Sequence, residues 1–186
     1  MVYYFIAFGL FAARKIGDQL RSRRNFDALV PRRLLPGNDP AFGWLWATHL
    51  AFFILTPLEI IFFRRQFVPV LGIPMIFLFV AATSLRYWSR SLLGSCWTSQ
   101  VAVPIDIQPI VRGPYRLIRH PNYLAMSLEL LSMDLIYTAY LSALVVAILN
   151  AWTVVLRIRF EEHCLLQIPA YRDAMQAKAR LIPGIY

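Results

Sequence analysis

The stretch from Ala41 to Phe63 constrains the fold of this chain more than any other, because it is almost entirely apolar. Its only ionisable side chains are His49 and Glu59. A helix needs about 20 predominantly apolar residues to cross the hydrocarbon core of a bilayer, and this stretch reaches that length. Pro57 predicts a kink, which membrane helices tolerate when neighbouring groups satisfy the freed carbonyl. The sequence therefore predicts a transmembrane helix.

The composition agrees with an integral membrane protein. Hydrophobic residues make up 59% of the 186 residues, charged residues only 16%, and the mean hydropathy is +0.54. Soluble domains carry about 25% charged residues. A soluble domain is therefore the less favoured interpretation.

The net charge of +9 would suggest nucleic-acid binding in a soluble protein. Here the basic residues lie between apolar runs, so membrane topology explains them better and no nucleic-acid partner is expected. Cys96 and Cys164 lie far apart and form no CxxC pair. Their spacing predicts neither a disulfide framework nor a zinc site, and no metal is expected.

The apolar pattern predicts an all-α, polytopic protein with about five transmembrane helices in a single domain over residues 1–186. The expected spans are Met1–Ala13 with an amphipathic continuation through Leu20, Ala41–Phe63, Phe67 to about Leu85, Leu124–Tyr140, and Leu141 to about Leu156. Arg14 and Lys15 are expected to reach from the first helix to the interface. The stretch from Arg21 to Pro40 is expected to be a loop, because prolines and a glycine make it rich in turns.

Residues 1–85 would then hold three spans, and residues 86–186 a polar loop, a helical hairpin and a C-terminal tail. Four prolines between Arg86 and Tyr123 forbid one long helix there. No polar linker separates the last two spans, which predicts a tight hairpin around Tyr137–Ser142. The last helix is expected to continue into water through Arg157 and Glu161.

The distribution of Lys and Arg predicts the topology. Five spans place the first loop, the segment from Arg86 to Arg119 and the tail on one side of the membrane, with 17 Lys and Arg residues. The opposite side holds only Arg64 and Arg65. The positive-inside rule then places the three basic segments in the cytosol and the N-terminus outside.

The loop from Arg112 to Tyr123 is the first candidate site, because it combines several donors with rigid backbone and aromatic rings. Its donors are Arg112, Arg116, Arg119 and His120, and its rings are Tyr115 and Tyr123. Pro114 and Pro121 fix φ, and Gly113 permits close backbone approach. Such a loop suits an anionic or nucleotide-like ligand, and equally a lipid head group.

Two sets of helical polar residues are further candidates. Arg157 and Glu161 are spaced i, i+4 on one helix face, so they form either part of a site or an ordinary surface ion pair. Glu129 and Asp134 lie inside an apolar helix. Burying a carboxylate in lipid costs several kcal/mol, so such residues face a cavity or a partner, or stay protonated and hydrogen-bonded.

Several segments resemble the isoprenylcysteine carboxyl methyltransferase family. Residues 119–123, Arg-His-Pro-Asn-Tyr, look like the family's RHPxY motif, and Gly-Pro-Tyr-Arg precedes them at 113–116. The tail is similar at Arg157, Glu161, Glu162, Leu165, Tyr171, Arg180, Ile182 and Pro183. Trp97 resembles the start of the cofactor loop, and residues 22–25 resemble the first loop of bacterial members. The combination is shared with wider relatives such as phospholipid methyltransferases.

The resemblance implies an integral membrane enzyme that uses S-adenosylmethionine in a cytosolic pocket formed by the loop and the C-terminal helix. It assigns cofactor contacts to Gly113, Tyr115, His120, Pro121, Tyr123, Glu161 and Glu162. It assigns catalytic roles to Arg119 and Arg157, which would orient an acidic acceptor. Glu129 is the candidate base if the acceptor is a phenol, with His120 as the other choice.

The expected reaction is methylation of a lipophilic carboxylate, such as that of a prenylated cysteine, in a multi-pass protein of a prokaryotic plasma membrane. The expected partners are lipidated or lipophilic substrates and membrane lipids. The alternatives are O-methylation of a long-chain phenol, methylation of a phospholipid amine, and a non-catalytic lipid-binding protein. Ala125 stands where the family often has Gly, which bears on substrate choice.

Overall fold

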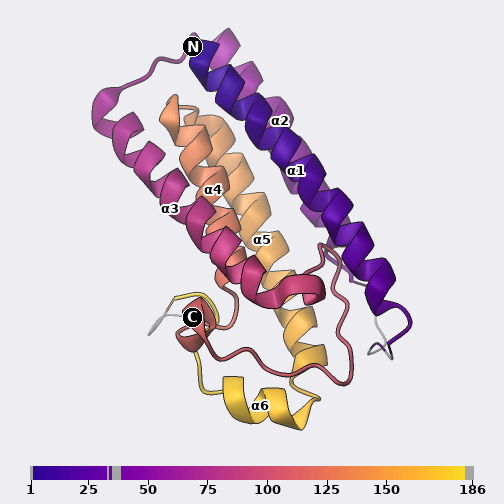
Figure 1. The fold of residues 1–186 in the computed structure, drawn as a ribbon. Coiled ribbons are helices and arrows are strands. Elements are labelled where there is room, and N and C mark those ends of the chain that lie inside the picture. The colour runs from indigo at the N-terminus through magenta and orange to yellow at the C-terminus, as the bar shows by residue number, and fades with distance from the viewer. Residues whose placement is uncertain (1, 33, 35–38, 183–186) are drawn as a thin grey trace.

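Five long helices run side by side and are capped at one end by loops and a short helix (Figure 1). The computed structural model describes residues 2–32, 34 and 39–182. The helices are α1 (Val2–Leu29), α2 (Phe42–Phe62), α3 (Pro69–Leu93), α4 (Pro121–Ile136), α5 (Tyr140–Leu165) and α6 (Pro169–Met175), with 3-10 turns η1 (Gly94–Cys96) and η2 (Gly113–Arg116). The described residues form no named strand, only two isolated bridges. The predicted all-α class is confirmed.

Three of these helices are each long and apolar enough to cross a membrane within the described part of the chain. They are α2, α3 continued through η1 to Cys96, and α5. Helix α4 has 16 residues, which at 1.5 Å per residue span about 24 Å. Helix α1 is apolar to Ala13 and carries charged residues from Arg14 onward. The protein is therefore an integral membrane protein, in which α1 and α4 complete the predicted set of about five helices.

The predicted loop from Arg21 to Pro40 is wrong in its first part, because α1 continues to Leu29. Tertiary contacts hold the polar end of this helix. The Ser22 hydroxyl accepts a hydrogen bond from the Ser99 amide at 2.7 Å, and the Asn25 amide donates to the Trp97 carbonyl at 2.6 Å. Two of the predicted turn residues, Pro36 and Gly37, lie outside the described residues.

Aromatic packing joins α1 to the rest of the bundle. Phe8 of α1 stacks on Phe52 of α2 with ring centroids 5.2 Å apart, and Phe11 meets the same ring edge-on. The Tyr4 hydroxyl donates to the Met133 carbonyl of α4 at 3.0 Å. Aromatic pairs of this kind add about 0.5–1.5 kcal/mol each beyond their area burial. They fix α1 against α2 and α4 at the end distant from the cap.

The predicted hairpin between the last two spans is present, with its turn at Thr138 in a left-handed conformation (φ +55°). Glu59 of α2 stabilises the start of α5. Its carboxylate accepts the Ser142 backbone N–H at 2.6 Å and the Ser142 hydroxyl at 2.7 Å, and pairs with Arg65 at 2.7 Å. A carboxylate beside the free N–H groups of a helix N-terminus is favourable. Glu59 therefore has a structural role at the end distant from the cap.

The cap holds the candidate loop in place through the C-terminal tail. The backbone N–H groups of Arg119 and His120 donate to the carbonyls of Ala179 and Arg180 at 2.9 and 3.0 Å. Buried apolar side chains, including Leu165, join the loop to α5 and α6. The loop thus lies against the tail at the cap end of the bundle (Figure 1).

Candidate functional site

One cavity of about 890 Å³ runs from the cap into the helical bundle. Its cap end is lined by Tyr115, His120, Tyr123, Glu161 and Tyr171. Its side towards α1 and α2 is lined by apolar side chains, which are Ala12, Ile16, Leu20, Leu45, Leu50 and Phe53. Ligand sites commonly occupy about 300–1,000 Å³. The cavity is large enough for a nucleotide-sized ligand and part of a lipid chain.

His120, Tyr123 and Glu161 form the polar corner of the cap end. The Tyr123 hydroxyl donates to Glu161 Oε2 at 2.6 Å, and the His120 and Tyr123 rings stack with centroids 5.5 Å apart. His120 Nδ1 lies 3.9 Å from the same carboxylate oxygen. Pro121 begins α4 directly after His120, so the helix start fixes both rings. The structure therefore brings the predicted motif and Glu161 together.

The two adjacent glutamates have different surroundings. Glu162 is buried, and its carboxylate accepts hydrogen bonds from His120 Nε2 at 3.1 Å and from Arg180 Nε at 2.9 Å. The same carboxylate lies 3.1 Å from Arg119 Nη1. Glu161 has a quarter of its side chain exposed and lines the cavity. Only Glu161 is thus placed to meet a ligand directly, whereas Glu162 holds Arg119 and His120 in position.

Arg157 is engaged by the protein itself. Its guanidinium donates to Asp39 Oδ2 at 2.7 Å, to the Ser99 carbonyl at 2.6 Å and to the Tyr123 hydroxyl at 3.3 Å. Asp39 also accepts the Ala41 N–H at the start of α2 at 3.0 Å. Arg157 of α5 therefore contacts three other elements: the segment before α2, the loop after η1, and helix α4. It lines the cavity with its charge already matched.

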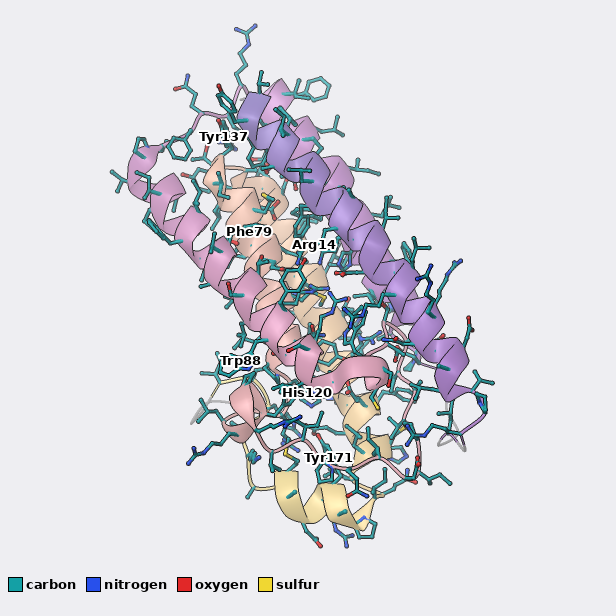
Figure 2. The ribbon with its side chains drawn as sticks, in the orientation of Figure 1. Arg14, Phe79, Trp88, His120, Tyr137 and Tyr171 are labelled. Carbon is teal, nitrogen blue, oxygen red and sulfur yellow. The ribbon has the colours of Figure 1, made fainter. Side chains whose placement is uncertain are left out.

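Glu129 lies at the centre of a buried ion cluster rather than on the cavity wall. Its carboxylate accepts Arg14 Nη2 at 2.7 Å, Arg86 Nη1 at 2.9 Å and the Thr83 hydroxyl at 3.0 Å, with Lys15 Nζ at 3.4 Å. Arg14 thus points from α1 into the bundle instead of reaching for the interface (Figure 2). Asp134, the other carboxylate of α4, accepts the Thr56 hydroxyl at 2.6 Å.

Gly113 determines the backbone conformation of the cap loop and is not part of the described cavity wall. Its φ is +58°, a region that residues with a side chain rarely adopt. A Cβ there would lie 2.6 Å from Leu92 Cδ1 and 3.2 Å from the Trp88 ring. Neither Gly113 nor Pro121 is among the described residues that line the cavity. Their contribution is to shape the loop that carries Tyr115 and His120.

We expect Gly113→Ala to lower the melting temperature of the purified protein by roughly 5 °C, because the left-handed backbone and the contact with Leu92 cost about 1–3 kcal/mol. Gly43→Ala in α2 is the control, since a Cβ there meets nothing within 4 Å. It should leave the melting temperature unchanged or raise it. Equal melting temperatures for Gly113→Ala and wild type would contradict the role of this glycine.

The walls of the cap end are neutral aromatic groups. Burial raises the pKa of the Tyr115 phenol, with a further contribution from nearby Glu161, and burial likewise raises the pKa of Tyr171. Both rings therefore remain uncharged at neutral pH. Figure 2 shows His120 and Tyr171 at the junction between the bundle and α6. An aromatic, uncharged wall beside a carboxylate suits a ligand that has both a flat heterocycle and an ammonium group.

Two buried polar atoms at this end have no hydrogen-bond partner within the described residues. They are Arg119 Nε, a donor, and Asn122 Oδ1, an acceptor, and both residues line the cavity. Leaving such groups unsatisfied costs about 1–3 kcal/mol each. A ligand with a carboxylate and an amine would satisfy both. The residues present at this end therefore fit a ligand such as S-adenosylmethionine, which carries both groups.

Sequence reasoning missed Asp39, Asn122 and Lys15 as site residues. Asn122 lies inside the recognised motif, and its position there was a usable signal. Asp39 and Lys15 carried none, because their partners Arg157 and Glu129 lie more than a hundred residues away. Ala125 is fully buried in α4 and is not among the described lining residues.

The architecture and the site describe a membrane-embedded protein with a polar, aromatic pocket at the end of its helices. A family model described as the isoprenylcysteine carboxyl methyltransferase (ICMT) family matches residues 75–167, half of the chain. The chain belongs to this family of membrane methyltransferases. It is also 26% identical over 165 residues to the uncharacterized protein YpbQ of Bacillus subtilis strain 168, across 87% of this chain and 96% of that protein.

Proposed function

We propose that this protein transfers a methyl group from S-adenosylmethionine to a lipophilic carboxylate acceptor. The observation that carries the proposal is a continuous cavity, which joins the polar corner at Glu161 to an apolar passage between α1 and α2. A cofactor with an ammonium and a carboxylate suits the first part. A long hydrocarbon chain suits the second.

S-Adenosylmethionine supplies an electrophilic methyl group on a sulfonium. Glu161 would hold the cofactor's ammonium, Arg119 its carboxylate, and Tyr115 and Tyr171 would enclose its heterocycle. Arg119 keeps its orientation through Glu162, and His120 through Glu162 and the stacked Tyr123 ring. These residues bind and orient, so they require no proton transfer of their own.

A carboxylate acceptor is already ionised at neutral pH and needs no base. Alignment of its oxygen with the methyl group, in a site closed to water, supplies most of the acceleration. Arg157 supports this alignment by holding the loop after η1 against α5, through its bonds to Asp39 and Ser99. The basic loops and the cap would face the cytosol, where S-adenosylmethionine is made.

His49 favours a second candidate, methylation of a long-chain phenol. Its Nδ1 lies 2.8 Å from the Leu45 carbonyl, which can only accept, so a neutral ring carries its proton on Nδ1. Nε2 is then an acceptor, and His49 lines the cavity among the apolar residues of α2. A phenol would need such a base to lose its proton.

The test is transfer of labelled methyl groups from S-adenosylmethionine into a total lipid extract by the purified protein in bilayer nanodiscs. We expect label in the lipid fraction that mild alkali releases as methanol, because esters are base-labile. Label that resists alkali would support an ether and the second candidate. No transfer together with no cofactor binding at millimolar concentration would contradict both enzymatic functions.

A further inference from the structure

The ion cluster around Glu129 contains more cations than carboxylates. Its members are Arg14, Lys15, Arg86, Arg90, Asp18 and Glu129. The nitrogen–oxygen distances of its ion pairs lie between 2.6 and 3.7 Å. Four basic side chains therefore share two carboxylates, a formal excess of two positive charges in a region enclosed by α1, α3 and α4. Buried charge without a counter-ion is costly, particularly at membrane depth.

Lys15 and Arg86 are the basic members of the cluster that line the cavity, among the residues that the structure describes. Lys15 has three donor hydrogens but, among the described residues, only one carboxylate contact, at 3.4 Å from Glu129. Arg86 pairs with Glu129 at 2.9 Å through Nη1, while its buried Nε has no partner within the described residues. Their side chains are 10% and 6% exposed. Both are thus nine-tenths buried and incompletely satisfied.

Lys15 and Arg86 both line the cavity, on the side where its wall changes from polar to apolar. Further from the cap, the cavity wall includes Ala12 on α1 and Leu50 and Phe53 on α2. Of the other cavity-lining arginines, Arg119, Arg157 and Arg32 already pair with Glu162, Asp39 and Asp106, and Arg23 is exposed to solvent. Excess positive charge and an apolar passage therefore meet at one place.

We propose that Lys15 and Arg86 bind the ionised carboxylate head group of the lipophilic acceptor, with its chain lying between α1 and α2. The inference rests on the proposed function and names the residues that recognise the acceptor. Acceptor recognition is thereby assigned to Lys15 and Arg86 instead of Arg119, which is proposed to bind the cofactor, and Arg157, which pairs with Asp39. A bound carboxylate would balance part of the cluster's excess charge and accept from the free Arg86 Nε–H.

Methylation would remove the attraction that this subsite provides. The acceptor oxygen forms a bond to the methyl carbon as the bond between that carbon and sulfur breaks, so the carboxylate becomes a neutral ester and the sulfonium a neutral thioether. The ester no longer attracts Lys15 and Arg86. The subsite thus distinguishes acceptor from product and favours product release into the bilayer.

The test uses two photoreactive probes, a palmitic acid that carries a diazirine on its chain and the methyl ester of the same compound. Each is irradiated with the protein in nanodiscs, and labelled peptides of α1 and α2 are quantified by mass spectrometry. We expect at least about fivefold more labelling by the acid than by the ester, equivalent to about 1 kcal/mol. Lys15→Met should reduce this preference to near parity, and Lys15→Arg should restore it.

Arg21→Met is the matched control, because Arg21 is an exposed cation of the same helix. It should retain the preference for the acid. Equal labelling by acid and ester in the wild type, or an undiminished preference in Lys15→Met, would overturn the subsite. S-Adenosylmethionine affinity, measured on the same samples, separates the two proposals: its absence in wild type contradicts the methyltransferase function, whereas the comparison of probes still tests the subsite.

Discussion

Glu161→Gln is expected to weaken S-adenosylmethionine binding by about 10- to 100-fold. Glu161 is the carboxylate of the polar corner that lines the cavity, with Tyr123 as its donor at 2.6 Å. Loss of a hydrogen bond to a charged group costs about 1.5–3 kcal/mol, which corresponds to this range. Isothermal titration calorimetry of the purified protein in detergent measures the effect directly.

Glu162→Gln provides the comparison, since it makes the same replacement of a carboxylate by an amide at the neighbouring residue. Glu162 is buried among His120, Arg119 and Arg180, so its substitution should chiefly lower the melting temperature. Asp173→Asn, an exposed change on α6, should alter neither property. Wild-type affinity in Glu161→Gln would refute the assignment of this residue to the cofactor.

Arg157→Met is expected to lower the melting temperature by roughly 10 °C. The substitution leaves Asp39 buried without its charged partner at 2.7 Å, and removing one member of a buried ion pair costs about 3–5 kcal/mol. Asp39→Asn should be destabilising for the same reason. The double variant should be more stable than the sum of the two single effects predicts, because no uncompensated charge remains. Thermal unfolding in detergent, followed by intrinsic fluorescence, measures all three.

Arg159→Met is the control for Arg157, because it removes an exposed cation from the same helix. Its melting temperature should match that of the wild type. The Arg157 variant also distinguishes a structural role from direct contact with the acceptor. An unchanged melting temperature together with a raised KM for the acceptor would show that Arg157 binds the substrate, contrary to the geometry described above.

The division of roles within the site follows from burial more than from residue type. Glu161 and Glu162 are identical side chains on consecutive positions of α5, which point about 100° apart on a helix. One faces the cavity and the other meets three basic groups of the loop and the tail. Of the pair predicted from sequence to hold the cofactor, Glu161 therefore faces the cavity and Glu162 is buried against the loop and the tail.

The apolar runs of the sequence predicted the helices of the membrane region well, and polar stretches less well. The α2 helix spans Phe42–Phe62 against an expected Ala41–Phe63. The ends of α1 and α3 extend beyond their predictions, to Leu29 and Leu93. Length and hydropathy are local properties that report on the bilayer. A polar helical turn is stabilised by tertiary contacts with distant residues, and the local sequence carries no signal of those contacts.

The sequence by itself determined the class of this protein: apolar segments of bilayer length, a loop with the family motif, and a glutamate pair one helix later. Only the tertiary structure decided which charges are satisfied and which face the cavity. Arg157 finds Asp39 across 118 positions of the chain, and Arg14 finds Glu129 across 115. In a low-dielectric interior the free energy of a charge depends on its partner, and the partner is chosen by packing rather than by proximity in sequence.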